Sequence, residues 1–215
     1  GADSWSYVRP QAFIENYRNQ TTLEQMERYP NVDWQKALFN DFAMSYQANV
    51  NVSGGTKFVK YFASADYINE GDLFKVYPNN RGYESGCGYD RINVRSNLDF
   101  KITNTTTLKV NLSGSSARRT APTMNSTNDI WQIQQQWAGA YNIAPDVFLP
   151  VYSDGAWGYY PQTSNVTNSA QNLSTGGIFE TTTNRINTDF TLEQDLGFIT
   201  EGLSLRGLIS WDNQF

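Results

Sequence analysis

Three carboxylates near the C-terminal end of the sequence have a spacing that could support acid-base chemistry. Asp189, Glu193 and Asp195 are separated by even numbers of residues, so an extended strand would project all of them from one face. Paired carboxylates are the catalytic groups of glycoside hydrolases. Repeated acids on a wet strand face are more often solvated or paired with cations such as Arg185. We therefore expect no catalytic residues and no enzyme activity.

A second group of oxygen ligands, at the end of an expected strand, could hold calcium. It comprises Asp66, Asn69, Glu70 and Asp72, whose spacing does not follow a defined calcium loop, so a polar turn is favoured. The chain has no histidine and one cysteine, Cys87. This composition argues against a histidine-based triad, a zinc site and a disulfide framework. We expect neither a metal nor a cofactor.

Aromatic side chains in the second half of the sequence are candidates for contact with a substrate or partner. Aromatic residues make up 14% of the chain. Their faces stack on sugar rings and peptide side chains while their polar edges stay hydrated, although each could instead anchor a loop. The candidates are Trp131, Trp137, Trp157, Tyr159 and Tyr160.

The elements that position these side chains are predicted to be β-strands with one apolar and one polar face. In the segment 91–103 apolar and polar residues alternate, and the pattern recurs at 46–52, 59–67, 106–116, 186–196 and 203–212. A shift of one residue in the pairing register would move the apolar side chains to the polar face, so the register of each strand is strongly constrained. The apolar positions of the first segment are Ile92, Val94, Leu98, Phe100 and Ile102.

Helical patterns are confined to the N-terminal region and to one long connection. Residues 10–39 read as short helical pieces, with a Thr21/Glu24 capping box and with Asp33 as the cap of a helix over 34–39. A further helix is predicted over 128–138. The rest of the segment 119–183 has no regular pattern, and connections of this length tend to be functional loops.

The connections between the predicted strands alternate in length. Turns near Gly54, Asn104 and Glu201 are short, whereas the connections 70–90 and 119–183 are long. Together with strands that can cross a bilayer, this pattern is typical of outer-membrane β-barrels. A soluble β-sandwich is the alternative. Charges along whole strands favour a water-filled lumen on the polar side, and Trp211 is assigned to the aromatic girdle at the membrane interface.

The predicted fold class is therefore all-β, an antiparallel transmembrane β-barrel segment. About six strands cannot close a membrane barrel, because open edges would leave unpaired backbone groups in lipid. The chain is expected to be part of a larger protein. Its net charge of −5 argues against nucleic-acid binding, and it has neither an apolar run long enough for a transmembrane helix nor a signal-peptide pattern at its start.

Four short phrases carry a resemblance to a known family. They are residues 29–35 (YPNVDWQ), 49–56 (NVNVSGGT), 60–64 (KYFAS) and 95–101 (RSNLDFK), in that order. The series resembles the SusC/RagA-type TonB-dependent transporters of Bacteroidetes outer membranes. The resemblance covers residues 29–118; the later loop is similar only in being long and aromatic, and the last hairpin fits generically.

This resemblance implies a barrel of about 22 strands enclosing an N-terminal plug. The TonB, ExbB and ExbD complex would energise it, a SusD-like lipoprotein would cap its outer face, and the substrate would be an oligosaccharide or a peptide. Residues 1–44 would form an extracellular helical segment, and residues 45–215 a partial barrel in outer-membrane lipid, with extracellular loops at about 70–90 and 119–183. The sequence contains no plug and no TonB box, so these residues alone would not transport. A passive porin and a secreted carbohydrate-binding sandwich are the alternative functions.

Overall fold

The computed structural model describes residues 8–123, 129–161 and 166–215 of the chain. The contacts divide it into two compact units, each built from separate stretches of sequence. The sheet unit comprises residues 44–71, 88–120 and 180–215, and the loop unit comprises residues 1–43, 72–87 and 121–179. The long connections and the N-terminal segment therefore fold together as one body.

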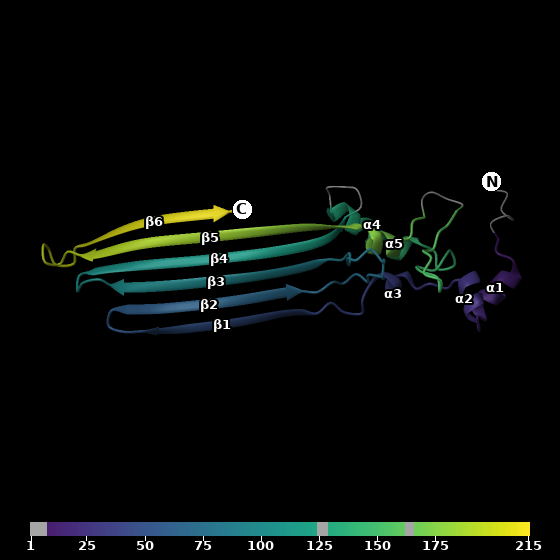
Figure 1. Cartoon of the computed structure of the whole chain (residues 1–215), viewed down its shortest axis with the longest axis horizontal. Helices are drawn as coiled ribbons and strands as arrows, with labels where there is room; N and C mark the ends of the chain where they lie inside the picture. The colour runs from purple at the N-terminus through teal and green to yellow at the C-terminus, as the bar shows by residue number, and fades with distance from the viewer. Residues whose placement is uncertain (1–7, 124–128, 162–165) are drawn as a thin grey trace. The chain divides into compact units, whose positions relative to one another are not determined.

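The sheet unit is built on long strands that pair in the order of the sequence. All six strands belong to one sheet with the order β1-β2-β3-β4-β5-β6, as Figure 1 shows. Strand β1 pairs antiparallel with β2, β2 with β3, β3 with β4, and β5 with β6. The strands are β1 Ser45–Gly55, β2 Val59–Glu70, β3 Gly88–Lys101, β4 Thr106–Thr123, β5 Gly177–Asp195 and β6 Ser204–Gln214.

The register of the sheet confirms the predicted alternation of faces. Val50 lies opposite Ala65, Ala65 opposite Val94, and Val94 opposite Gly114, so one face carries small and apolar side chains across four strands. Neighbouring positions, such as Asn93 and Asn49, belong to the opposite face. The prediction of an antiparallel all-β segment is confirmed. A sandwich is not, because the described strands form one sheet rather than two packed sheets.

The loop unit contains the helices of the chain. They are α1 Gln11–Arg18, α2 Leu23–Arg28, α3 Trp34–Leu38, α4 Asp129–Asn142 and α5 Ser169–Thr175. Helices α3, α4 and α5 contact one another, and a Cβ at Gly139 would overlap the Ser169 side chain, so this glycine permits the close approach of α4 and α5. None of the described helices has the length and hydropathy needed to cross a membrane.

A small aromatic core holds the loop unit together. Trp34, Leu38 and Phe148 are almost completely buried, at 3%, 0% and 1% exposure. The rings of Trp34 and Phe148 meet edge to face at 5.3 Å, and Trp34 Nε1 donates a hydrogen bond to the carbonyl of Ala144 at 3.2 Å. The indole ring is therefore buried against Phe148 while its N–H keeps a hydrogen-bond partner, as a buried tryptophan requires.

Several predicted boundaries are corrected by the structure. The capping box uses Thr22 and Gln25, whose side chains each accept a hydrogen bond from the other's backbone N–H, rather than Thr21 and Glu24. The predicted Asp33 cap is confirmed, because its carboxylate accepts from the Lys36 backbone N–H at 3.2 Å.

The irregular segment predicted at 119–183 is shorter than expected. β4 continues to Thr123, β5 begins at Gly177, α4 ends at Asn142 rather than at residue 138, and α5 was not predicted. The start of β5 was missed because the run Thr181 to Asn184 is polar at every position and shows no alternation.

Candidate functional site

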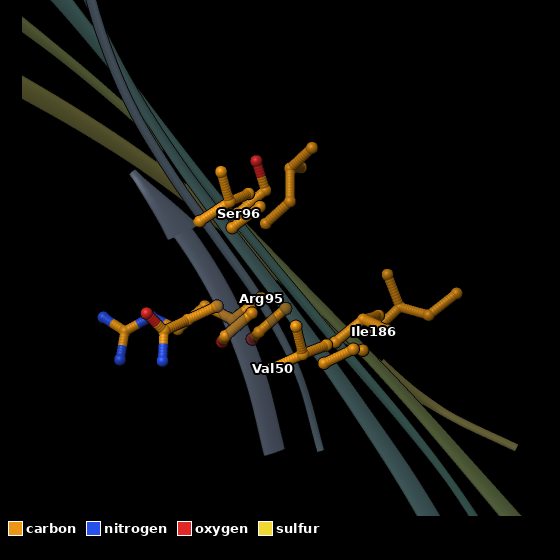
Figure 2. Close-up of a pocket in the computed structure, with 13 residues that line it drawn as sticks. Val50, Arg95, Ser96 and Ile186 are labelled. Atoms are coloured by element: carbon orange, nitrogen blue, oxygen red, sulfur yellow. The ribbon is translucent and has the colours of Figure 1, made fainter. Parts of the chain in front are cut away.

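The apolar face of the sheet is exposed along its whole width. Val50, Ile209 and Trp211 are 66%, 72% and 63% exposed, although their side chains are apolar. A contiguous exposed apolar surface of this kind marks a membrane or protein contact. Figure 2 shows Arg95 pointing away from the side on which Val50 and Ile186 project. A shallow hollow of about 690 Å³ on this face is lined by apolar groups that include Val50, Val52, Ala63, Ala65, Val94 and Leu112.

Polar groups end the apolar face near the start of β3. Asp90 accepts hydrogen bonds from the Tyr67 hydroxyl at 2.8 Å and from Asn69 Nδ2 at 2.7 Å. Next to it on β4, Arg118 forms an ion pair of 2.9 Å with Glu180. From Ile92 on β3 to Ile102, one residue past its end, the apolar positions span roughly 34 Å along the strand direction, or about 26 Å across a membrane at a tilt of about 40°. That height matches the apolar band of about 25 Å on outer-membrane barrels.

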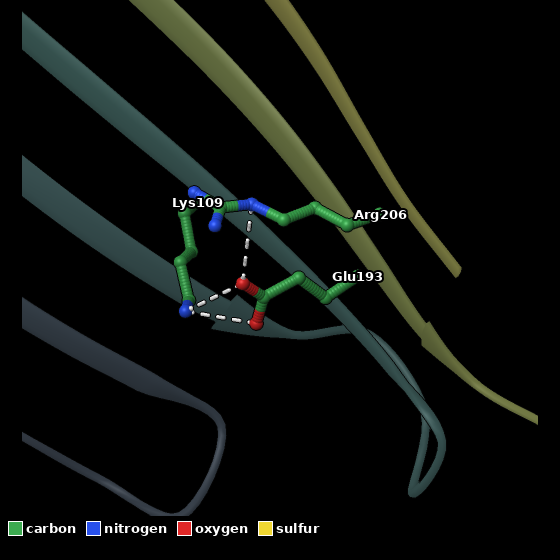
Figure 3. A network of polar contacts seen from close by, with 3 residues as sticks. All are labelled: Lys109, Glu193 and Arg206. Atoms are coloured by element: carbon green, nitrogen blue, oxygen red, sulfur yellow. Dashed lines mark hydrogen bonds and ion pairs between the residues drawn. The ribbon is translucent and has the colours of Figure 1, made fainter. Parts of the chain in front are cut away.

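The polar face carries a row of charges that alternate in sign across five strands. Lys60 lies opposite Asp99, and Asp99 lies opposite Lys109. Figure 3 shows the other end of the row, where Glu193 Oε2 is 2.8 Å from Lys109 Nζ and Glu193 Oε1 is 3.9 Å from Arg206 Nε. Exposed pairs contribute little stability individually. Their value here is diagnostic, because such a row requires water on this face.

The three carboxylates that could have been catalytic have structural partners. Glu193 pairs with Lys109 and Arg206, Asp189 accepts a hydrogen bond from the Ser210 hydroxyl at 2.6 Å, and Asp195 accepts from the Gly197 backbone N–H at 2.7 Å. Arg185, the partner expected from the sequence, instead donates from Nε to Gln214 at 3.0 Å. The cations come from adjacent strands, a pairing that sequence spacing alone did not reveal.

The four residues considered for calcium do not converge. Asp66 and Asn69 lie on opposite faces of β2, where Asp66 accepts from Gln47 and Asn93. Asp72 accepts two backbone hydrogen bonds within the loop unit. Among the described residues, no group of three or more acidic, cysteine or histidine side chains is placed to hold a metal ion.

The aromatic candidates in the loop unit have different surroundings. Trp137 packs against Phe39 at 5.2 Å and Phe74 at 6.4 Å, and Trp157 packs edge to face against Tyr77 at 6.4 Å. Tyr160 is half-buried against the core. Trp131 belongs to α4, but its side chain lies outside the described part of the structure. Trp137, Trp157 and Tyr160 therefore pack within the loop unit, although Trp137 is still 45% exposed.

Tyr159 is the most exposed of the candidates whose side chains are described, at 76% against 45% for Trp137. It lines a pocket of about 340 Å³ together with Pro161 and the α5 residues Gln171 and Asn172. Asn168 holds the pocket's shape, since its Nδ2 donates to the carbonyls of Pro150 at 2.8 Å and Gly158 at 3.1 Å. A ring beside amide groups can stack on a ligand and hydrogen-bond to it. The α5 amides were missed because nothing in the sequence indicated this helix.

Asp72 fastens the loop between β2 and β3. Its Oδ1 accepts from the Phe74 backbone N–H at 2.8 Å, and its Oδ2 accepts from the Cys87 backbone N–H at 2.7 Å. Burial raises the pKa of the Asp72 carboxyl above its ordinary 3.8, and the two hydrogen bonds only partly oppose this rise. A raised pKa means that folding favours the protonated acid.

The Asp72 carboxyl therefore makes the loop unit pH-sensitive. Its contribution to stability is fully present below pH 3.8, the ordinary pKa, and is lost as the pH rises through the higher folded pKa. Asp72→Asn removes this titration and one acceptor, at a constant cost of about 1 kcal/mol. In urea unfolding between pH 3 and 6, the stability advantage of the wild type over the variant will narrow as the pH rises. If the unfolding free energies of the wild type and the variant differ by the same amount at every pH, this account is wrong.

Comparison with known proteins gives a likeness in fold. Neither a protein-family model nor a curated protein matches the sequence. Among solved structures, a chain in the structure of the RagAB peptide transporter superposes with a TM-score of 0.57 and 19% sequence identity. The match covers 85% of this chain and 19% of that chain. The fold is shared with one part of that transporter. The present chain thus spans about a fifth of the transporter's length.

Proposed function

We propose that this chain is a wall segment, with its external loops, of an outer-membrane nutrient importer of the SusC/RagA type. The observation that carries the proposal is the contrast between the two faces of one sheet. One face is apolar and exposed over a membrane-sized height, and the other carries the charge row from Lys60 to Arg206. Lipid on the first face and a water-filled lumen on the second account for both.

The stagger of the hairpins supports closure into a barrel. In the first hairpin, Gly55 and Lys60 are the last residue pair before the turn. Lys60 is also paired with Asp99, and Asp99 with Lys109 in the second hairpin. The second hairpin continues for two more residue pairs beyond Asp99 and Lys109 before its turn. If both turns lie at the same height at the membrane surface, the register shifts by two residues per hairpin, or one residue per strand. An advance of about 3.3 Å over a strand spacing of about 4.8 Å corresponds to a tilt of roughly 35°, as barrels require.

The proposed substrate is a peptide or an oligosaccharide, with a SusD-like lipoprotein as partner and TonB, ExbB and ExbD as the energy source. The likeness to a peptide transporter supports a peptide. These activities belong to the whole protein, whose remaining strands would complete the barrel. The proposal gives the chain no enzymatic role.

Energised import can be separated from passive diffusion in cells that carry the full-length protein. Uptake of labelled peptides and labelled oligosaccharides would be compared with and without functional TonB. We expect uptake of one substrate class to fall at least about tenfold without TonB, because a plugged lumen passes nothing until energy moves the plug. Uptake that does not depend on TonB would identify a porin and overturn the importer.

The Tyr159 pocket provides a residue-level test of substrate or partner contact. Tyr159→Ala will weaken binding of the substrate or of the lipoprotein about two- to tenfold, the value of one aromatic contact. The matched control is Tyr141→Ala, since Tyr141 is also exposed in the loop unit, at 62%, and does not line the pocket. Binding would be measured by titrating the purified full-length protein with the substrate or the lipoprotein. If both variants weaken binding equally, the pocket is not a contact site.

A further inference from the structure

Three arginines converge on the polar face of the sheet, away from the charge row. Arg91, Arg119 and Arg185 line a pocket of about 320 Å³, which also includes Tyr89 and Thr183. They come from β3, β4 and β5 and lie within the sheet unit. The pocket is thus built on hydrogen-bonded strands rather than on loops, which fixes its geometry.

The register explains why the space between the arginines is open. Arg91 lies opposite Ala117, and Tyr89 lies opposite Arg119. Ala117, which also lines the pocket, is too short to fill the space between the larger side chains. An open volume surrounded by guanidinium and hydroxyl groups is a site for a ligand rich in acceptors.

The residues that line this pocket carry only positive charge. No carboxylate is among the residues that line it. Arg91 Nε is buried without a hydrogen-bond partner in the described part of the chain, while Arg185 Nε is held by Gln214. Asp66 lies on the same face but outside the pocket, where it accepts hydrogen bonds from Gln47 and Asn93 and attracts Arg91 at longer range.

We propose that Arg91, Arg119 and Arg185 form a carboxylate-binding site for the substrate. This inference rests on the proposed function and deepens it, because it selects peptides that carry a free C-terminal or side-chain carboxylate. A guanidinium presents parallel N–H donors that match the two oxygens of a carboxylate, and such charge-assisted hydrogen bonds are stronger than neutral ones. The Tyr89 and Thr183 hydroxyls supply further donors at the rim.

Binding measurements on the purified full-length protein test the site. One peptide would be titrated with its C-terminus free and with its C-terminus amidated, both without acidic side chains. Arg91→Gln and Arg185→Gln will each weaken binding of the free acid about tenfold and leave binding of the amide within about twofold, because only the acid uses the guanidinium groups. Heat-modifiable migration on a gel will confirm that both variants are folded.

Arg95→Gln is the matched control. Arg95 lies on the same face of β3, four residues from Arg91, and does not line the pocket. Loss of free-acid binding in Arg95→Gln, or equal loss of acid and amide in the pocket variants, would overturn the proposal.

Succinate separates failure of the site from failure of the proposed function. If no peptide binds but calorimetry shows succinate binding that Arg91→Gln abolishes, the carboxylate site stands and peptide import fails. If the wild type binds neither succinate nor the free acid, the site itself is refuted.

Discussion

Val50→Arg will strongly reduce the amount of full-length protein that folds in the outer membrane. Val50 is 66% exposed and lies halfway along β1 on the apolar face, in a row with Ala65, Val94 and Gly114. An arginine at the bilayer midplane of a barrel costs about 2 to 4 kcal/mol. Because whole proteins are stable by only about 5 to 15 kcal/mol, this single change removes a large fraction of the stability.

The neighbouring residue provides the control for this experiment. Asn49→Arg places the same side chain on the polar face, opposite Asp66, where water and a carboxylate accept it. Heat-modifiable migration of outer-membrane fractions will show folded protein for Asn49→Arg and a strongly reduced folded fraction for Val50→Arg. If both variants fold equally well, the apolar face does not contact lipid and the barrel proposal fails.

Phe148→Ala will unfold the loop unit and spare the sheet unit. The Phe148 side chain is 1% exposed and packs edge to face on Trp34 at 5.3 Å. Removing a buried phenylalanine ring costs about 3 to 5 kcal/mol, through lost burial and the cavity left behind. A unit with so small a core cannot absorb that loss.

Limited proteolysis of intact cells will measure this effect. We expect rapid cleavage within residues 121–179 in Phe148→Ala, while heat-modifiable migration stays normal. Phe42→Ala is the matched control, since Phe42 belongs to the same unit but is 70% exposed. Cleavage of the control at the same rate would show that the core described around Trp34 does not stabilise the loops.

The sheet could be predicted from the sequence because its signal is local. Apolar and polar residues alternate with a period of two, so the two faces of each strand can be assigned from its own sequence without knowing which strands pair with it. Helix α5 had no such signal. Its residues Ala170 and Leu173 are buried, but so are Ser169 and Ser174, so packing rather than an amphipathic pattern defines the helix.

The sites could be predicted only in part, because they depend on which strands and loops meet. Glu193 finds Lys109 at a separation of 84 residues, and the three arginines of the pocket come together only through the register of β3, β4 and β5. The aromatic residues were identified by type. Their packing partners could not be predicted, because Phe39, Phe74 and Tyr77, which contact Trp137 and Trp157, lie far from them in the sequence.

The interleaved organisation of the two units has a consequence for the order of assembly. The hydrogen bond between Trp34 and Ala144 closes a loop of 110 residues that contains four of the six strands. Closing such a loop is entropically costly while the intervening chain is unfolded, and becomes cheap once its hairpins are paired. The loop unit, and with it the pocket beside Tyr159, therefore matures after β1 to β4. A chain stalled before strand pairing would present no binding surface at all.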